Sequence, residues 1–223
     1  MVRVFSRVSG ALLVAVCVAA LSGCAGNVAP EVKRLPERVE LSGTFYRGEA
    51  NQSGPQVLAS LLSQQGIVIT PGLLEKPLHL PGAEDKLQQN MQNLAREYGL
   101  VVYPLDARLP ALLSQVAAGY PVMVRFSEGS AFWAEPRYAI LSGYDRNKQK
   151  VLLRAGMNRR QLMDFGSFES ALEKAGGWAI LIQKPSQIPA AVDRSRWLKA
   201  ADELAQAGEE NAAAQARKAL AAQ

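Results

Sequence analysis

The most reactive kinds of side chain are scarce in this chain of 223 residues. It has two cysteines, Cys17 and Cys24, and a single histidine, His79. Beyond residue 24 there is no thiol that could act as a nucleophile, form a disulfide or bind a metal. One imidazole without a thiol cannot build a zinc site of the His and Cys type. We also find no phosphate-binding loop, nucleotide fingerprint or calcium loop, and therefore expect no metal and no cofactor.

Cys24 stands at the end of a segment with the features of a signal peptide. The first seven residues carry two positive charges, and residues 10–21 are almost wholly apolar but too short to span a bilayer as a helix. The run ends in Leu21-Ser22-Gly23-Cys24, which resembles the lipobox of bacterial lipoproteins. The resemblance implies removal of residues 1–23 and acylation of Cys24. Since Ala25 rather than Asp follows, it favours the outer membrane, with the protein facing the periplasm.

The charge balance bounds the classes of partner. Loss of Arg3 and Arg7 with the signal lowers the net charge from +5 to +3, and the remaining charges are scattered along the chain. Together with an envelope location, this argues against a nucleic-acid partner. We expect instead a polypeptide segment or an envelope protein, with the membrane reached through the lipid on Cys24.

Hydrophobic spacing predicts helices first and strands later, the α+β pattern. Residues 24–41 are polar, contain prolines and are predicted to be a lipidated tether. The predicted helices of the main domain, residues 42–186, are 55–65, 84–98, 109–118 and 168–175, with a turn or short helix at 70–74 and a loop at 76–82. Its predicted strands are 100–104, 121–126, 138–144, 151–154, 160–165 and 178–183.

Residues 190–223 differ in composition from the main domain. Trp197, Leu198, Ala201, Leu204 and Ala205 form one helical stripe, Gly208 interrupts it, and a second helix is predicted over residues 212–222. This pattern resembles a single tetratricopeptide hairpin. Because one hairpin cannot bury its own apolar face, it must dock on the main domain, on a partner or on another copy.

Four short stretches give the main domain a family resemblance. They are Gln52-Ser53-Gly54-Pro55, Leu80-Pro81-Gly82, the strand from Tyr138 to Asp145, and Trp178-Ala179-Ile180-Leu181. In order and spacing they resemble the papain-like cysteine peptidases of the bacteriocin double-glycine leader type, in particular lipid-anchored members with tetratricopeptide tails. The resemblance implies a papain-like cysteine peptidase fold, with N-terminal helices packed on an antiparallel sheet, plus a C-terminal α-helical hairpin.

The chemistry of that family does not transfer to the matching positions. The resemblance places Ser53 where the family has its catalytic Cys, Arg137 where it has the basic His, and Gly48 where it has the oxyanion Gln. Ala155 stands where an Asp or Asn would orient the His, and Asn158 is a poor substitute by spacing. A guanidinium cannot give up its proton near neutral pH, and a serine hydroxyl without a base is a weak nucleophile. These four changes predict a pseudoenzyme with no catalytic residues.

Other roles remain for the residues of the degenerate site. Ser53 is predicted to cap the helix that follows it, since His79 lies in a proline-bounded loop and is read as a surface residue. Arg137 would either hold an anionic group in the cleft or be a solvated charge at a strand edge. Phe132 and Trp133 would either contact a ligand or pack into the core. With Ser53 and Tyr138, these are the candidate residues of a binding cleft.

We therefore expect an outer-membrane lipoprotein with a catalytically inactive peptidase-like domain that binds a polypeptide or partner protein in the periplasm. One alternative is a peptidase or Ser-based hydrolase with a rebuilt site. Another is a pure assembly scaffold that acts through the helical hairpin of residues 190–223.

Overall fold

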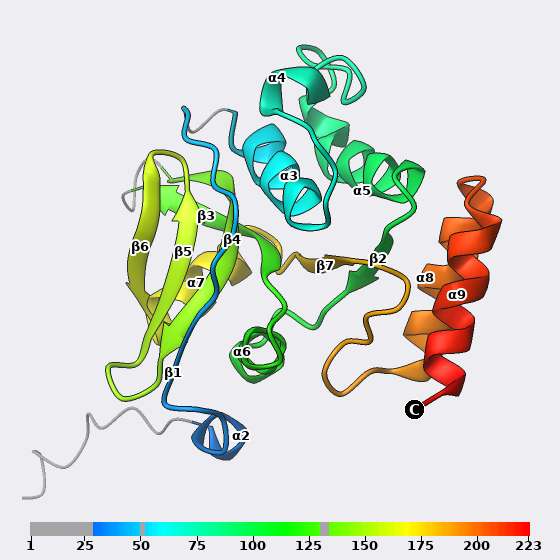
Figure 1. Ribbon diagram of the computed structural model, residues 1–223. Coiled ribbons are helices and arrows are strands. Elements are labelled where there is room, and N and C mark those ends of the chain that lie inside the picture. Colours follow the sequence, from blue (N-terminus) through cyan, green and yellow to red (C-terminus); the bar gives the residue numbers. More distant parts are fainter. Residues whose placement is uncertain (1–28, 50–51, 130–133) are drawn as a thin grey trace, which may run out of the picture.

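The computed structural model describes residues 29–49, 52–129 and 134–223, and the predicted signal peptide and Cys24 lie outside these ranges. Seven strands of the described chain form one antiparallel sheet in the order β2-β7-β3-β4-β5-β6, with β1 also paired to β4 (Figure 1). The strands are β1 (Arg38–Glu40), β2 (Val101–Pro104), β3 (Val122–Gly129), β4 (Ala134–Asp145), β5 (Lys150–Ala155), β6 (Asn158–Asp164) and β7 (Ala179–Gln183).

Helices cover the two faces of this sheet. The helices of the described chain are α2 (Pro30–Lys33), α3 (Ser53–Gln64), α4 (Pro71–Leu74), α5 (Leu87–Glu97), α6 (Leu109–Ala117), α7 (Phe165–Lys174), α8 (Arg194–Gln206) and α9 (Glu210–Ala221), and a 3-10 helix spans Glu84–Lys86. The α+β prediction is thus confirmed. None of the helices within the described ranges is long and apolar enough to cross a membrane.

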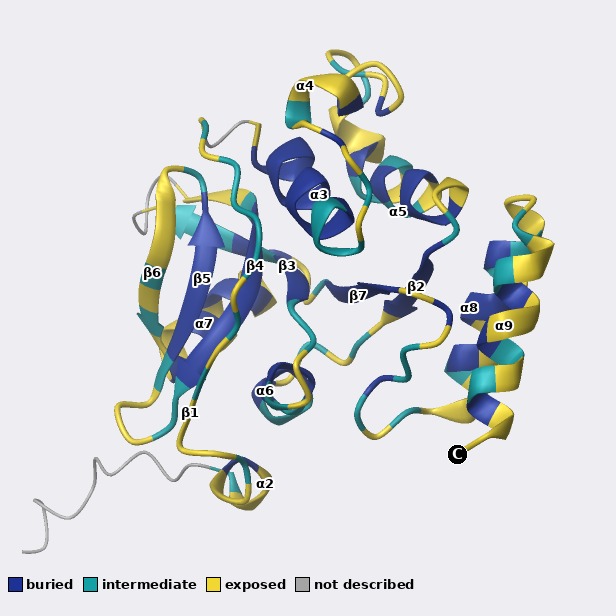
Figure 2. Cartoon of the chain, in the orientation of Figure 1, coloured by how far each residue is buried: buried dark blue, intermediate teal, exposed yellow. Residues whose placement is uncertain are grey.

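Side-chain alternation along the strands divides the core into two layers. On β2, Val102 packs with α3 and α5, whereas Val101 and Tyr103 pack on the other side with α6 and the C-terminal helices. On β3, Met123 faces the first layer and its neighbours face the second. Successive side chains of a strand point to opposite faces, so strands buried on both faces need the continuous apolar runs seen here. Figure 2 shows β7 buried throughout and β2 buried except at Pro104, while the edge strand β6 is largely exposed.

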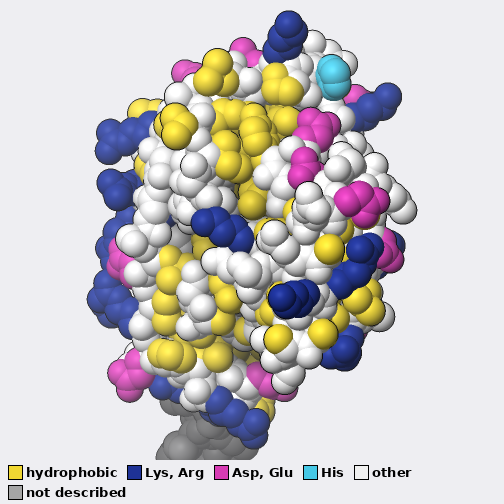
Figure 3. All heavy atoms as spheres, turned by 45° about the vertical axis from the view of Figure 1, so that its right-hand side comes forward, with side chains coloured by type: hydrophobic (Ala, Val, Ile, Leu, Met, Phe, Trp, Pro, Cys, Tyr) yellow, Lys and Arg dark blue, Asp and Glu magenta, His cyan; other side chains and the backbone are white. Residues whose placement is uncertain are grey.

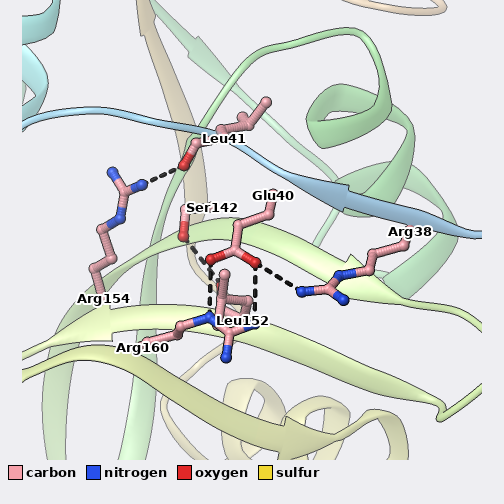
Figure 4. A network of polar contacts seen from close by, with 7 residues as sticks. All are labelled: Arg38, Glu40, Leu41, Ser142, Leu152, Arg154 and Arg160. Atoms are coloured by element: carbon pink, nitrogen blue, oxygen red, sulfur yellow. Dashed lines mark hydrogen bonds and ion pairs between the residues drawn. The ribbon is translucent and has the colours of Figure 1, made fainter.

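The predicted tether is shorter than the sequence suggested. Residues 30–40 contribute α2 and β1, and Val32 is fully buried against the core. Strand β1 is held by polar contacts at its end: Glu40 accepts from Arg160 and Arg38, and the Arg154 guanidinium donates to the carbonyl oxygen of Leu41 (Figure 4). The boundary placed at residue 41 therefore falls inside the fold, and at most the residues before Pro30 are left to act as a tether.

The C-terminal hairpin docks on the main domain. Trp197 is fully buried, its ring centroid lies 5.9 Å from that of Tyr103 on β2, and its Nε1–H donates to the carbonyl oxygen of Ala216 at 2.8 Å. Arg96 of α5 pairs with Glu203 of α8 at 2.5 Å. The apolar face of the hairpin thus docks on the main domain, the first of the three possibilities that the sequence left open. Leu198, which was expected in the apolar stripe, is 40% exposed.

Candidate functional site

Helix α3 brings the nucleophile position of the resemblance against strand β4. Ser53 is the first residue of α3 and only 5% exposed, and its Oγ accepts a hydrogen bond of 3.2 Å from the backbone N–H of Tyr138. The prediction that Ser53 caps the helix is wrong. The helix begins two residues before Pro55, Gln52 occupies the cap position, and the serine hydroxyl is used by the strand instead.

The hydrogen bond between Ser53 and Tyr138 also limits the distance between Ser53 and Arg137. Arg137 directly precedes Tyr138, so standard bond lengths limit the separation of the Ser53 and Arg137 Cα atoms to about 8 Å. The structure therefore brings together two of the positions that sequence reasoning placed opposite each other. Neither carries the group that a cysteine peptidase requires.

Arg137 already has an anionic partner. Its Nη2 lies 2.6 Å from Oε2 of Glu135, two residues earlier on the same strand and therefore on the same face. The Arg137 side chain is 20% exposed and that of Glu135 is 67% exposed. Across the ladder, Glu135 stands opposite Glu128 of β3. An anionic ligand at Arg137 would have to displace Glu135 and tolerate the carboxylate of Glu128.

Sequence reasoning missed Glu135, although the signal was present. An acid two residues from an arginine on a predicted strand shares its face, so the ion pair could have been proposed from spacing alone.

Tyr138 is a buried side chain of β4 and not a free acid or base. It is 8% exposed and meets Trp178 edge to face, with ring centroids 5.7 Å apart. Burial raises the pKa of the Tyr138 phenol to about 12. The hydroxyl therefore stays protonated near neutral pH and cannot accept a proton in place of the missing imidazole.

Gly48 leaves room for a glutamine from a different element. A Cβ at Gly48 would lie 1.9 Å from Nε2 of Gln56, so the Gln56 side chain fills the space beside the glycine. Gln56 is 4% exposed, its Nε2 donates to the carbonyl oxygen of Glu49 at 3.3 Å, and its Oε1 has no partner in the described residues. Gln56 lies three residues after Ser53, so the sequence spacing already places both side chains on one face of α3.

Ala155, the position that would orient a catalytic histidine, lies close to the segment that contains Gly48. Ala155 is 5% exposed at the end of β5, and Asn158 is exposed and begins β6. The backbone N–H of Gly48 donates to the carbonyl oxygen of Gly156 at 3.4 Å, so the 43–49 segment lies against this turn. A methyl group at residue 155 cannot accept a hydrogen bond, whatever residue stands across from it.

The remaining candidates contribute little to the described geometry. Phe132 and Trp133 lie outside the described residues. His79 is exposed in the turn after α4, and within the described chain no hydrogen bond links it to Ser53. No group of three or more His, Cys, Asp or Glu side chains in the described ranges is arranged to hold a metal ion.

Two pockets lie away from Ser53 and Arg137. One of about 570 Å³ is lined by Tyr120, Ile188, Lys218 and neighbours at the end of α9, and one of about 550 Å³ lies between α5 and α8. Neither is lined by Ser53 or Arg137.

The layered sheet, with the start of α3 placed against β4, has the fold of the C39-like peptidases, which is a papain-type fold. A protein from Bacillus anthracis described as a C39-like peptidase superposes with a TM-score of 0.50 at 15% identity, covering 67% of this chain and 98% of that one. A double-glycine motif protease of an AMS/PCAT transporter, solved with its leader peptide, gives a TM-score of 0.47 at 12% identity, covering 68% and 95%. No family model and no curated relative matches the sequence.

Proposed function

We propose that this chain is a lipid-anchored protein of the outer membrane whose peptidase-like domain binds a polypeptide segment in the periplasm without cleaving it. One observation carries the proposal: the Ser53 hydroxyl accepts the Tyr138 N–H in a buried contact, where a cysteine peptidase would hold its thiol beside a base. Arg137, next to that contact, carries a permanent charge and cannot activate a nucleophile.

The fold itself supports a polypeptide as the ligand. Extended segments are commonly recognised by main-chain pairing at exposed strands, and the edge strand β6 of this sheet is largely exposed. The scaffold alternative has less support, because the apolar face of the hairpin packs on the main domain and is not available to a partner. The lipid anchor rests on Leu21-Ser22-Gly23-Cys24, which precedes the described residues.

Turnover measurements test the loss of catalysis. We expect the purified protein to hydrolyse a panel of peptides and esters no faster than its Ser53→Ala variant. Hydrolysis by the wild type that disappears in Ser53→Ala would contradict the proposal and establish a rebuilt serine site. Mass spectrometry of the mature protein tests the anchor separately, with Cys24→Ala as the control in membrane fractionation.

Calorimetry with a peptide recovered by pull-down tests the binding role. Arg137→Ala should lose about tenfold in affinity for a carboxylate-bearing segment, the effect of one charge-assisted hydrogen bond, and Arg137→Lys should recover part of it. Since Glu135 competes for the same guanidinium, Glu135→Gln should bind more tightly than the wild type. Equal affinity in all four proteins would exclude Arg137 from the binding surface.

A further inference from the structure

The first described residues are fastened to the domain at one end of the molecule. Val32 of α2 is fully buried with α6, the Arg146 guanidinium donates to the Lys33 carbonyl oxygen, and the Arg146 N–H donates to the Glu37 carbonyl oxygen at 2.8 Å. Residue 146 belongs to the turn between β4 and β5. From Pro30 onward, the chain therefore moves with the domain and not as a loose linker.

The chain length before Pro30 limits how far the domain can stand from an acylated Cys24. Six residue steps separate Cys24 from Pro30, and a fully extended chain covers at most about 22 Å in that length. A compact chain of this size has a radius of gyration of about 17 Å. The tether therefore reaches little more than the radius of the molecule, and the end with α4, opposite α2 in Figure 1, lies beyond it.

Basic side chains gather at the tethered end. The surface formed by α2, the start of β1 and the β4–β5 turn, here called the α2 surface, has three carboxylates: Glu31, Glu37 and Asp145. Its six cations are Lys33, Arg34, Arg38, Arg146, Lys148 and Lys150. In Figure 3, a few Lys and Arg side chains lie at the lower end, where Figure 1 has α2, beside acidic ones, and more line the left edge.

Part of this positive charge is already neutralised. Arg38 pairs with Glu40 at 3.1 Å and Lys150 with Asp164 at 3.0 Å, whereas Lys33, Arg34 and Lys148 form no ion pair with a described residue. The net surplus is small. It can bias the direction in which the domain faces but cannot by itself hold the protein on a bilayer.

We propose that the α2 surface faces the membrane and that its cations contact the phosphate groups of anionic phospholipids. This inference rests on the proposed acylation of Cys24. The lipid supplies the affinity, and the short tether with the basic surface sets the orientation, which turns the α4 end away from the bilayer. Screening confines the contribution of charge to distances of about 8 Å at physiological salt, a range that only the tethered end can enter.

Site-specific fluorescence can test this orientation, because the described chain contains no cysteine. The full acylated protein is placed in vesicles of phosphatidylcholine and phosphatidylglycerol that carry a quencher on the lipid headgroup. A fluorophore is attached either to Asn147→Cys in the β4–β5 turn or to Glu75→Cys after α4, both exposed positions. We expect strong quenching at residue 147 and weak quenching at residue 75. Equal quenching at the two positions overturns the proposal.

A longer tether and reversed charges separate the two causes. A flexible Gly-Ser insertion between Ala29 and Pro30 should reduce the difference between the two labels while leaving acylation intact. Lys148→Glu should shift the balance between facing and turned-away orientations by at least about fivefold in vesicles with phosphatidylglycerol. It should have no effect in phosphatidylcholine alone, and Lys76→Glu at the α4 end should be silent in both. If the difference in quenching between the two labels is unchanged after the insertion, the short tether does not set the orientation.

Mass spectrometry of each variant distinguishes a failed orientation from a failed anchor. An acylated protein with equal quenching at both positions refutes the orientation only, whereas a protein without lipid on Cys24 refutes the proposed anchor and the orientation with it.

Discussion

Two contacts between a helix and the central sheet differ in kind: Trp197 of α8 packs on β2, and Ser53 at the start of α3 hydrogen-bonds to β4. The first contact buries a whole indole, which meets the Tyr103 ring at a tilt, and satisfies its only polar atom with the Ala216 carbonyl oxygen. The second buries a hydroxyl that accepts one backbone N–H, and the nearby Gln56 leaves its Oε1 unpaired among described residues. Further along α3, apolar side chains such as Leu58 and Leu61 share a core layer with the sheet.

The two contacts should therefore contribute very different amounts to the free energy of folding. Burial of large apolar side chains is the main favourable term in folding, and a single neutral hydrogen bond contributes little by comparison. The hairpin is therefore part of the core, despite its resemblance to a separate repeat. The Ser53 hydroxyl at the start of α3, in contrast, contributes one neutral hydrogen bond, so its loss should cost less than loss of the Trp197 indole.

Removal of the indole should have the largest effect. Trp197→Ala should lower the free energy of unfolding by about 3–5 kcal/mol, through lost burial and the cavity left behind. Chemical denaturation followed by circular dichroism measures this. The neighbouring Leu198→Ala is the matched control: that side chain is 40% exposed, and its loss should change the free energy of unfolding by no more than about 0.5 kcal/mol. Equal effects would mean that the hairpin does not share the core.

Loss of the serine hydroxyl should have a smaller effect. Ser53→Ala leaves the buried N–H of Tyr138 without an acceptor, which should lower the free energy of unfolding by about 1–3 kcal/mol. Hydrogen exchange at the Tyr138 amide should accelerate more than at the neighbouring strand amides. The exposed Ser170→Ala in α7 serves as control. If Ser53→Ala matches the wild type in both measurements, the contact between α3 and β4 does not depend on this hydrogen bond.

The sequence carried most of the fold but little of the site's detail. Strands buried on both faces leave long apolar runs, and six of the seven strands were predicted, including the largely exposed β6. Strands β3 and β4 extend three to four residues beyond their predicted bounds, and the hairpin was predicted by its Trp197 stripe. Strand β1 and helix α2 were missed because Val32, Val39 and Leu41 are isolated apolar residues among polar ones. Strand β1 pairs with the backbone of β4, and α2 packs against α6, so the partners of both lie far along the chain.

The partner of Ser53 could not be predicted for the same reason. Local sequence suggests helix capping for a serine before Gly54-Pro55, whereas the observed donor lies 85 residues away. The ion pair of Arg137 with Glu135 is the opposite case, since both residues share one strand. Contacts within an element follow from its periodicity, and contacts between elements need the tertiary structure.

The smallest effect on stability is expected from the exposed polar contacts of Glu40, and this effect should depend on pH. Hydrogen bonds from Arg160, and secondarily from Arg38, hold the pKa of the Glu40 carboxyl at about 2, below its ordinary value of 4.5 (Figure 4). Because the pKa is lowered in the folded state, the stability that Glu40 contributes is present above pH 4.5 and is lost as the pH falls towards 2. The Glu40 side chain is 38% exposed, so solvent screening should limit the contribution to under ~1 kcal/mol.

Glu40→Gln tests this expectation when its unfolding is compared with that of the wild type across the acid range. Above pH 4.5 the wild type should be the more stable of the two by that small margin, and the margin should shrink to zero as the pH approaches 2. Glu31→Gln, at an exposed residue without an ion pair to the described chain, should show no such pH-dependent margin. A margin for Glu40→Gln as large as that for Ser53→Ala would mean that burial does not rank the polar contacts, and the contrast between the buried and exposed regions would lose its physical basis.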